Sequence, residues 1–330
     1  MKQRTNSWCV FPVLAMLLVA CGDQSSGRAR TAKPATPARK FYWIQPLKGH
    51  PVHQLTQIAF KEGCKQVGYE FEMAGTDTWD VGGTIALAEQ VLARGDAAGM
   101  AIWTGNPAYN SFIEKAGKAG VPIVLPHFPA NEGSIPGATG IIGCDPAAYA
   151  REAAAEIGKA IAGQGAVAVT QGSFNTTENL VTQSFKKAMT ETYPQVIVLA
   201  PVEEGFDPPG AIAKAVAILQ GNPAVVAALS TTGGGPITWA NAQKETGRKL
   251  VIVGMDYTRV NLDLVKSGEV YAVIGQPLWE ESYRAAELLA KALRGEKVEW
   301  WTRLPAPFIT KEKLEPYYLL LDKVEAAVGR

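Results

Sequence analysis

Several signatures that would point to an enzyme, a spanning membrane protein or a nucleic-acid binder are missing from this sequence. It has no G-x-S-x-G, H-E-x-x-H or phosphate-binding P-loop motif, so a hydrolase has little support and we do not expect an enzyme. The N-terminal apolar run, Trp8 to Ala20, has about 13 residues, fewer than the roughly 20 that a membrane-spanning helix needs. Once the first 40 residues are set aside, 25 basic residues face 30 acidic ones. A net charge of about −5 makes the remaining body a poor nucleic-acid binder.

The first 40 residues have the pattern of an export signal followed by a tether. Lys2 and Arg4 precede the apolar run, and Leu-Val-Ala-Cys at 18–21 closes it in the manner of a lipobox. We therefore expect a lipoprotein signal peptide over 1–20 and a lipidated, disordered tether over 21–40, with Cys21 as the lipidated residue. A plain secretory signal with a chance cysteine is the alternative. The pattern predicts an extracytoplasmic protein, in the periplasm or on the outer face, that is lipid-anchored to the cell membrane.

The body from Phe41 onward has the composition of a globular protein, since the chain is 47% hydrophobic and 19% charged. Cys64 and Cys144 are its two cysteines. An extracytoplasmic location permits a disulfide, but two small buried side chains fit the pattern equally well, so their pairing stays open.

Short apolar runs alternate with amphipathic stretches along the body, in two successive series. The first series includes FYWIQ at 41–45 and GMAIW at 99–103, and the second includes GAVAVTQG at 165–172 and KLVIVGMD at 249–256. Such alternation predicts α/β structure, with two doubly wound, Rossmann-like parallel-sheet domains. In open parallel sheets, ligands bind beyond the carboxyl ends of the strands, so the residues just after each apolar run are the candidates for a site.

Four segments carry a resemblance to a known family. They are AGVPIVLPHF at 119–128, GIIGCDPAAYAREAAAEIGKAI at 140–161, VIVGMDYT at 251–258 and AVIGQPLWEESYRAAELL at 272–289. With them, the chain from Phe41 to about Thr310 resembles the type I periplasmic-binding-protein-like solute receptors of the ribose- and sugar-binding family, which are lipoprotein components of ABC importers. The resemblance implies a monomeric receptor without a cofactor, which closes on a solute and delivers it to a membrane permease.

The expected domain limits follow from the same pattern. Crossovers between the two units are predicted near Cys144 to Asp145, near Gln276 and near Ala306, which makes a three-strand hinge. The N-terminal ligand-binding lobe then comprises 41–144 and 277–305. The C-terminal lobe comprises 145–276 and 306–330, and its tail from Lys311 has the pattern of a closing helix.

Twelve residues are the candidate ligand-binding positions, because they follow predicted strands or occupy positions that the resemblance marks. They are His50, His53, Trp103, Asn106, His127, Phe128, Asn179, Phe206, Thr232, Asp256, Gln276 and Trp279. Aromatic rings cover the apolar faces of a sugar, while amides, carboxylates and imidazoles bond hydroxyl groups. The set predicts a neutral polyhydroxyl ligand, namely a sugar, a polyol or a cyclitol. His127 and Phe128 stand where ribose receptors carry an Asp-Arg pair, so ribose itself is not supported.

Other functions stay open at this point. All three histidines of the chain are in the candidate set, and three imidazoles with Asp256 are chemically competent to bind zinc. The same aromatic residues suit the base of a nucleoside, and receptors for autoinducers or partners of membrane sensors share this fold. A transcription regulator would need a DNA-binding helix-turn-helix at its N-terminus, where this chain has its signal and tether instead.

Overall fold

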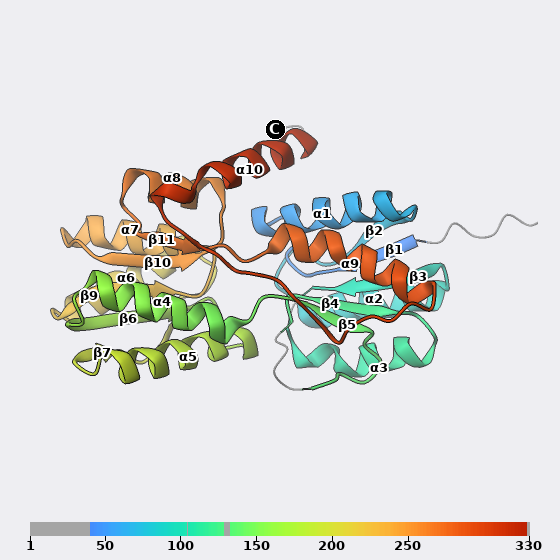
Figure 1. Cartoon of the computed structure of the whole chain (residues 1–330), viewed down its shortest axis with the longest axis horizontal. Coiled ribbons are helices and arrows are strands. Elements are labelled where there is room, and N and C mark those ends of the chain that lie inside the picture. The colour runs from blue at the N-terminus through green and yellow to red at the C-terminus, as the bar shows by residue number, and fades with distance from the viewer. Residues whose placement is uncertain (1–39, 104, 129–132, 329–330) are drawn as a thin grey trace, which may run out of the picture. The chain divides into compact units, whose positions relative to one another are not determined.

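The computed structural model describes residues 40–103, 105–128 and 133–328, which belong to a single compact unit of the chain (Figure 1). The predicted signal peptide, the lipidation site Cys21 and nearly all of the predicted tether lie outside the described residues. Within the described residues, none of the helices combines the length and the apolar character needed to cross a bilayer.

The first sheet is entirely parallel and has the strand order β12-β5-β4-β3-β1-β2. Its strands are β1 (Lys40–Ile44), β2 (Glu70–Ala74), β3 (Ala97–Ile102), β4 (Ile123–Pro126), β5 (Gly140–Gly143) and β12 (Trp301–Arg303). The helices of this half are α1 (Pro51–Val67), α2 (Val81–Arg94), α3 (Asn110–Lys118) and α9 (Leu278–Leu293), with the 3₁₀ turn η1 (Pro107–Tyr109).

The second sheet is parallel except at one edge and has the order β13-β11-β10-β9-β6-β7, with β8 also paired to β6. Its strands are β6 (Gly165–Gln171), β7 (Val196–Val198), β8 (Val202–Glu203), β9 (Val225–Ser230), β10 (Val251–Met255), β11 (Ala272–Ile274) and the antiparallel β13 (Phe308–Ile309). The helices of this half are α4 (Pro146–Ala160), α5 (Thr176–Thr192), α6 (Pro208–Gly221), α7 (Gly235–Thr246), α8 (Arg259–Ser267) and α10 (Glu315–Val328), with the 3₁₀ turn η2 (Lys311–Lys313).

Strand β1 shows why the sheets form as they do. Phe41 and Trp43 belong to the core under α1 and α9, whereas Tyr42 and Ile44 belong to the core under α2 and α3, and all four are fully buried. Successive side chains of a strand point to opposite faces, so a continuous apolar run requires helices on both faces. Figure 1 shows this double cover around each sheet.

The chain passes between the two sheets three times: from β5 to α4, from β11 to α9 and from β12 to β13. The predicted fold class, two doubly wound sheets joined by a three-strand hinge, is therefore confirmed. The exact limits of the two lobes stay predictions.

Cys64 and Cys144 are both buried and unpaired, which answers the question that the sequence left open. Burial raises the pKa of the Cys64 thiol to about 12, so the thiol stays protonated at neutral pH. We therefore assign both cysteines to the core as small apolar side chains.

Candidate functional site

A cavity of about 880 Å³ lies where the carboxyl ends of strands from the two sheets face each other. Nine of the twelve predicted residues line it: His50, His53, Trp103, Asn106, His127, Phe206, Thr232, Asp256 and Gln276. The strands set these positions, since each of the nine follows a strand of one of the two sheets. The cavity therefore lies where the rule for open parallel sheets places a ligand.

The other three predicted residues do not line the cavity. Phe128 is buried in the core under α2 and α3. The Asn179 amide oxygen accepts a hydrogen bond from Gln171 Nε2 at 3.0 Å. Trp279 packs in the other core of this half, with Lys323 Nζ 4.6 Å from the centre of its ring system. Contact of these three side chains with a ligand stays a prediction.

His53 is a neutral hydrogen-bonding group in the cavity wall. Its Nδ1 lies 2.9 Å from the carbonyl oxygens of both Pro46 and Leu47, so Nδ1 carries the proton and donates, and Nε2 is left as an acceptor. Burial, together with the charge of His50, lowers the pKa of His53 to about 4. The imidazole of His53 is thus uncharged at neutral pH.

His50 lies one helical turn before His53, because Pro51 begins α1 immediately after it. Their rings meet edge to face with centroids 5.3 Å apart. Burial lowers the pKa of His50, and its Nδ1 is buried without a hydrogen-bond partner. Among the residues that the structure describes, no group of three His, Cys, Asp or Glu side chains is placed to hold a metal ion.

His127, Trp103 and Glu281 form a polar cluster on the same wall. Glu281 is fully buried in α9, and its Oε1 lies 3.0 Å from His127 Nδ1 and 3.3 Å from Trp103 Nε1. The indole of Trp103 stacks on the His127 ring with centroids 4.7 Å apart. Burial lowers the pKa of His127, but the charge and the hydrogen bond of Glu281 raise it by more, so the net pKa is raised. Sequence reasoning missed Glu281, although it lies inside one of the four segments that carry the family resemblance.

Asp256 and Gln276 form the matching polar group at the second sheet. Gln276 Nε2 donates to Asp256 Oδ1 at 3.1 Å. Burial raises the pKa of the Asp256 carboxyl from 3.8 to about 6. Asp256 follows β10 with a φ of 69°, a left-handed conformation that Asp tolerates better than most residues. The Asn261 side chain holds this turn by donating to three carbonyl oxygens, including that of Asp256 at 3.0 Å.

Two further carboxylates face the cavity from the second half of the chain, at Glu178 and Glu204. Glu178 is held by four donors, among them Gly172 N at 2.7 Å and Thr231 Oγ1 at 2.6 Å. Glu204 accepts from Ser230 Oγ at 3.2 Å, and its Oε1 is buried without a partner. Burial raises the pKa of Glu204 to about 7. Glu204 was not foreseen, because it directly follows the two-residue strand β8, which has no strong apolar signal.

Trp79 and Phe206 reach across the cavity from the two sheets. Trp79 follows β2 and Phe206 follows β8, yet their ring centroids are 5.6 Å apart. Trp79 is 37% exposed and Phe206 is 50% exposed, which places the pair at the solvent edge of the cavity. Trp79 was also missed, although its position after a predicted strand is the signal that identified the others.

Among the described residues, the lining contains one basic side chain that is always charged, Arg259. Its guanidinium is already engaged, because it pairs with Asp322 at 2.5 Å and with Glu325 at 2.7 Å. The described wall thus has four buried or half-buried carboxylates and no unpaired lysine or arginine. Such a wall disfavours a phosphorylated or carboxylated ligand and suits one that is rich in hydroxyl groups.

Comparison with known proteins agrees with this geometry. The sequence profile of the family described as periplasmic binding protein domain matches residues 41–297. The sugar-binding protein of a sugar ABC transporter from Bacillus halodurans is similar, with a TM-score of 0.77 and 22% identity over 85% of this chain and 100% of that one. AraP, an arabinose-binding protein from Geobacillus stearothermophilus, has a TM-score of 0.74 and 23% identity over 86% of this chain and 100% of its own.

A carbohydrate transporter solute-binding protein from Agrobacterium radiobacter, in complex with D-arabinose, has a TM-score of 0.74 and 20% identity over 88% of this chain and 98% of its own. At these identities the structures show a shared fold, and the profile match over more than half of the chain shows the family. The resemblance read from the four segments is confirmed. The chain belongs to the periplasmic binding protein family and has the type I fold that it shares with sugar-binding proteins of ABC transporters.

Proposed function

We propose that this protein is the substrate-binding component of an ABC transporter, and that it binds a small neutral polyhydroxyl solute, namely a sugar, polyol or cyclitol. The observation that carries the proposal is the composition of the cavity lining, which combines imidazoles, amides and carboxylates with aromatic rings. The arabinose complex of the Agrobacterium relative supports the sugar class. The chemistry of this wall would bind hydroxyl groups without requiring a charge on the ligand.

The hydroxyl-bonding groups have complementary roles. His53 offers its Nε2 as an acceptor, since its Nδ1 is occupied by two carbonyl oxygens. Asp256 accepts, and the amide of Gln276 orients it. A sugar hydroxyl both donates and accepts, so it can bond to a carboxylate and an amide at once. Trp79 and Phe206 would cover the apolar face of the ring.

Delivery to a permease follows from the two-lobed fold. Binding energy stabilises the closed arrangement of the lobes, which the membrane partner recognises. The contact of Trp79 with Phe206 supports closure over the cavity, because it joins loops that follow strands of the two sheets. A monomer is sufficient for this mechanism, and it needs neither a cofactor nor a catalytic residue.

The proposed location is extracytoplasmic, with a lipid anchor in the cell membrane. The export signal and the Leu-Val-Ala-Cys sequence at 18–21 support lipidation of Cys21, and the family supports an extracytoplasmic location. A lipid on Cys21 would hold the receptor at the membrane that contains its permease.

Isothermal titration of the full-length protein tests the ligand class. The panel contains aldoses, ketoses, polyols and cyclitols, with nucleosides as the competing class. Thr232→Val, which removes one hydroxyl from the lining, should weaken sugar binding roughly two- to tenfold, in line with the loss of one hydrogen bond. Thr192→Val at the exposed end of α5 is the matched control. No heat with any sugar, polyol or cyclitol, or heat with nucleosides alone, contradicts the proposal.

A further inference from the structure

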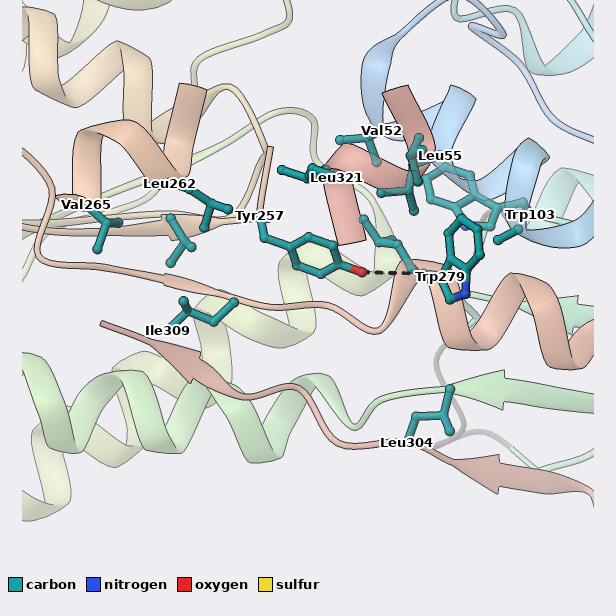
Figure 2. Close-up of a cluster of buried hydrophobic side chains, with 14 of the residues drawn as sticks. Val52, Leu55, Trp103, Tyr257, Leu262, Val265, Trp279, Leu304, Ile309 and Leu321 are labelled. Atoms are coloured by element: carbon teal, nitrogen blue, oxygen red, sulfur yellow. Dashed lines mark hydrogen bonds between the residues drawn. The ribbon is translucent and has the colours of Figure 1, made fainter. Parts of the chain in front are cut away.

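Part of the cavity lining, called the apolar end below, is formed by apolar side chains, two of which come from helix α10. Six apolar side chains form this end: Val52, Leu55, Tyr257, Leu278, Leu321 and Val324. None of them is more than 7% exposed. Figure 2 shows Leu321 beside Val52 and Leu55, with Tyr257 close by. These six side chains provide few hydrogen-bond partners for the hydroxyl groups of a sugar, and burying a hydroxyl without a partner is unfavourable.

Helix α10 is held in place from both halves of the molecule. On one side, Asp322 and Glu325 pair with Arg259 at the start of α8. On the other side, Lys323 Nζ lies 2.9 Å from Glu62 of α1. Leu321 and Val324 on the inner face of α10 also belong to the buried core, so this face packs against the rest of the molecule. The family match ends at residue 297, so this wall is built by a segment outside the matched range.

The size of the cavity leaves room for more than one sugar ring. Pockets for drug-sized ligands measure about 300–1,000 Å³, and this cavity of about 880 Å³ is near the upper limit. The lining also reaches solvent beside α10, because Val260 is 52% exposed. A ligand bound at the polar end can extend under α10 without filling a closed space.

We propose that the solute is a glycoside or polyol derivative that carries an apolar substituent, an alkyl or aryl group. Its hydroxylated part binds at the polar end of the cavity, near His53 and Asp256, and its apolar substituent lies against Leu321 and Val324 of α10. This inference rests on the proposed function and specifies the substrate class of the same site. Each methylene group that leaves water for the apolar wall contributes to affinity. The unsubstituted sugar lacks this contribution.

The first experiment is a titration series with the full-length protein. A sugar that binds in the panel is compared with its methyl, butyl and hexyl glycosides in both anomeric forms. For one anomer, we expect the dissociation constant to fall by about fourfold for each methylene that becomes buried. Equal affinity along both series, or affinity that decreases with chain length in both, overturns the inference and leaves the proposed function standing. No binding by any sugar, polyol or cyclitol of the panel, or by any of the glycosides, overturns the proposed function, and this inference with it.

The second experiment uses two leucines of the same helix. Leu321→Ala enlarges the apolar end, whereas Leu319→Ala changes a side chain that is 60% exposed. We expect Leu321→Ala to reduce severalfold the affinity advantage of the butyl glycoside over the parent sugar, while the dissociation constant of the parent sugar changes by less than twofold. Leu319→Ala should change neither quantity. Equal weakening of the parent sugar and the glycoside by Leu321→Ala overturns the inference, because it would mean that α10 only holds the lobes together. If Leu321→Ala does not fold, the same comparison is made with Val324→Ala, and the glycoside series on the unmodified protein still decides.

Discussion

The ring of Trp79 lies 5.6 Å from that of Phe206, centroid to centroid, although the two residues follow strands of different sheets. Neither ring is buried, since Trp79 is 37% exposed and Phe206 is 50% exposed. Exposed aromatic rings at a cavity edge lack the favourable free energy of hydrophobic burial, and the apolar face of a bound ligand would bury them. The pair is thus the part of the wall that we expect to respond most directly to ligand.

Trp79→Ala should weaken binding of the sugar that titrates by about two- to tenfold, the range expected for loss of one aromatic contact. Titration calorimetry measures the loss, and quenching of tryptophan fluorescence by ligand should decrease in parallel. Tyr271→Ala is the matched control, because Tyr271 is 38% exposed and lies outside the cavity lining. Unchanged affinity in Trp79→Ala contradicts a role for the pair in binding.

A second prediction concerns Asp256 and stability. Burial raises the pKa of this carboxyl from 3.8 to about 6, so the folded protein holds the proton more tightly than the unfolded chain. The contribution of Asp256 to stability is therefore most favourable below about pH 4, and it declines as the pH rises to about 6. Over about two pH units this amounts to roughly 3 kcal/mol as an upper limit.

Asp256→Asn should remove this decline and unfold at a higher temperature than the unmodified protein at pH 7. Asparagine suits the test because it accepts the φ of 69° at this position. Thermal unfolding between pH 4 and 8 is the measurement, with Asp77→Asn at a highly exposed side chain as the control. Burial also raises the pKa of Glu204, to about 7. Part of the loss of stability with rising pH should therefore remain in Asp256→Asn. Parallel curves for Asp256→Asn and the unmodified protein contradict the prediction.

The sheets and the general place of the site could be predicted from sequence for a definite physical reason. Runs such as Phe41 to Ile44 are apolar at every position, which only a strand covered on both faces can accommodate. Because parallel strands end at one edge of a sheet, any residue just after such a run was a reasonable candidate. His53, His127 and Asp256 were found in this way, and all three line the cavity.

Side-chain direction and tertiary pairing could not be predicted. Phe128 directly follows His127, yet its ring lies in the core while the histidine lines the cavity. Glu281 is in a helix rather than after a strand, so position gave no signal for it. Its role follows only from the approach of His127 and Trp103, which are more than 150 residues away in the chain.

The third prediction concerns the effect of Glu281 on the pKa of His127, which can be measured because the chain has only three histidines. Glu281 raises the net pKa of His127, so Glu281→Gln should lower it. Three histidines give few imidazole signals in an NMR titration, and His127→Gln assigns the relevant one. Glu280→Gln is the control, because Glu280 is the exposed neighbour of Glu281 in α9. An unchanged His127 titration in Glu281→Gln shows that the pair does not form in solution.

The pair of His127 and Glu281 should also make the stability of the protein depend on pH in a definite direction. A histidine with a raised folded pKa stabilises the protein fully below its unfolded pKa of about 6.5, and that contribution is lost as the pH rises through the folded value. Glu281→Gln should therefore lose more stability at pH 6 than at pH 9, relative to the unmodified protein. Chemical denaturation at the two pH values measures this difference.

The last prediction concerns membrane attachment, which we infer from the sequence at 18–21. Cys21→Ser should abolish labelling by a radioactive fatty acid in cells and release the protein from the membrane fraction, while sugar binding by the purified protein stays unchanged. Cys9→Ser provides a matched control, because Cys9 lies within the predicted signal peptide and should not be needed for lipidation. Each acyl chain contributes about 0.8 kcal/mol for every methylene in the bilayer, and stable anchoring takes more than one chain. Partial release of Cys21→Ser with labelling retained would assign the lipid to another residue, and the tether would then begin elsewhere in the chain.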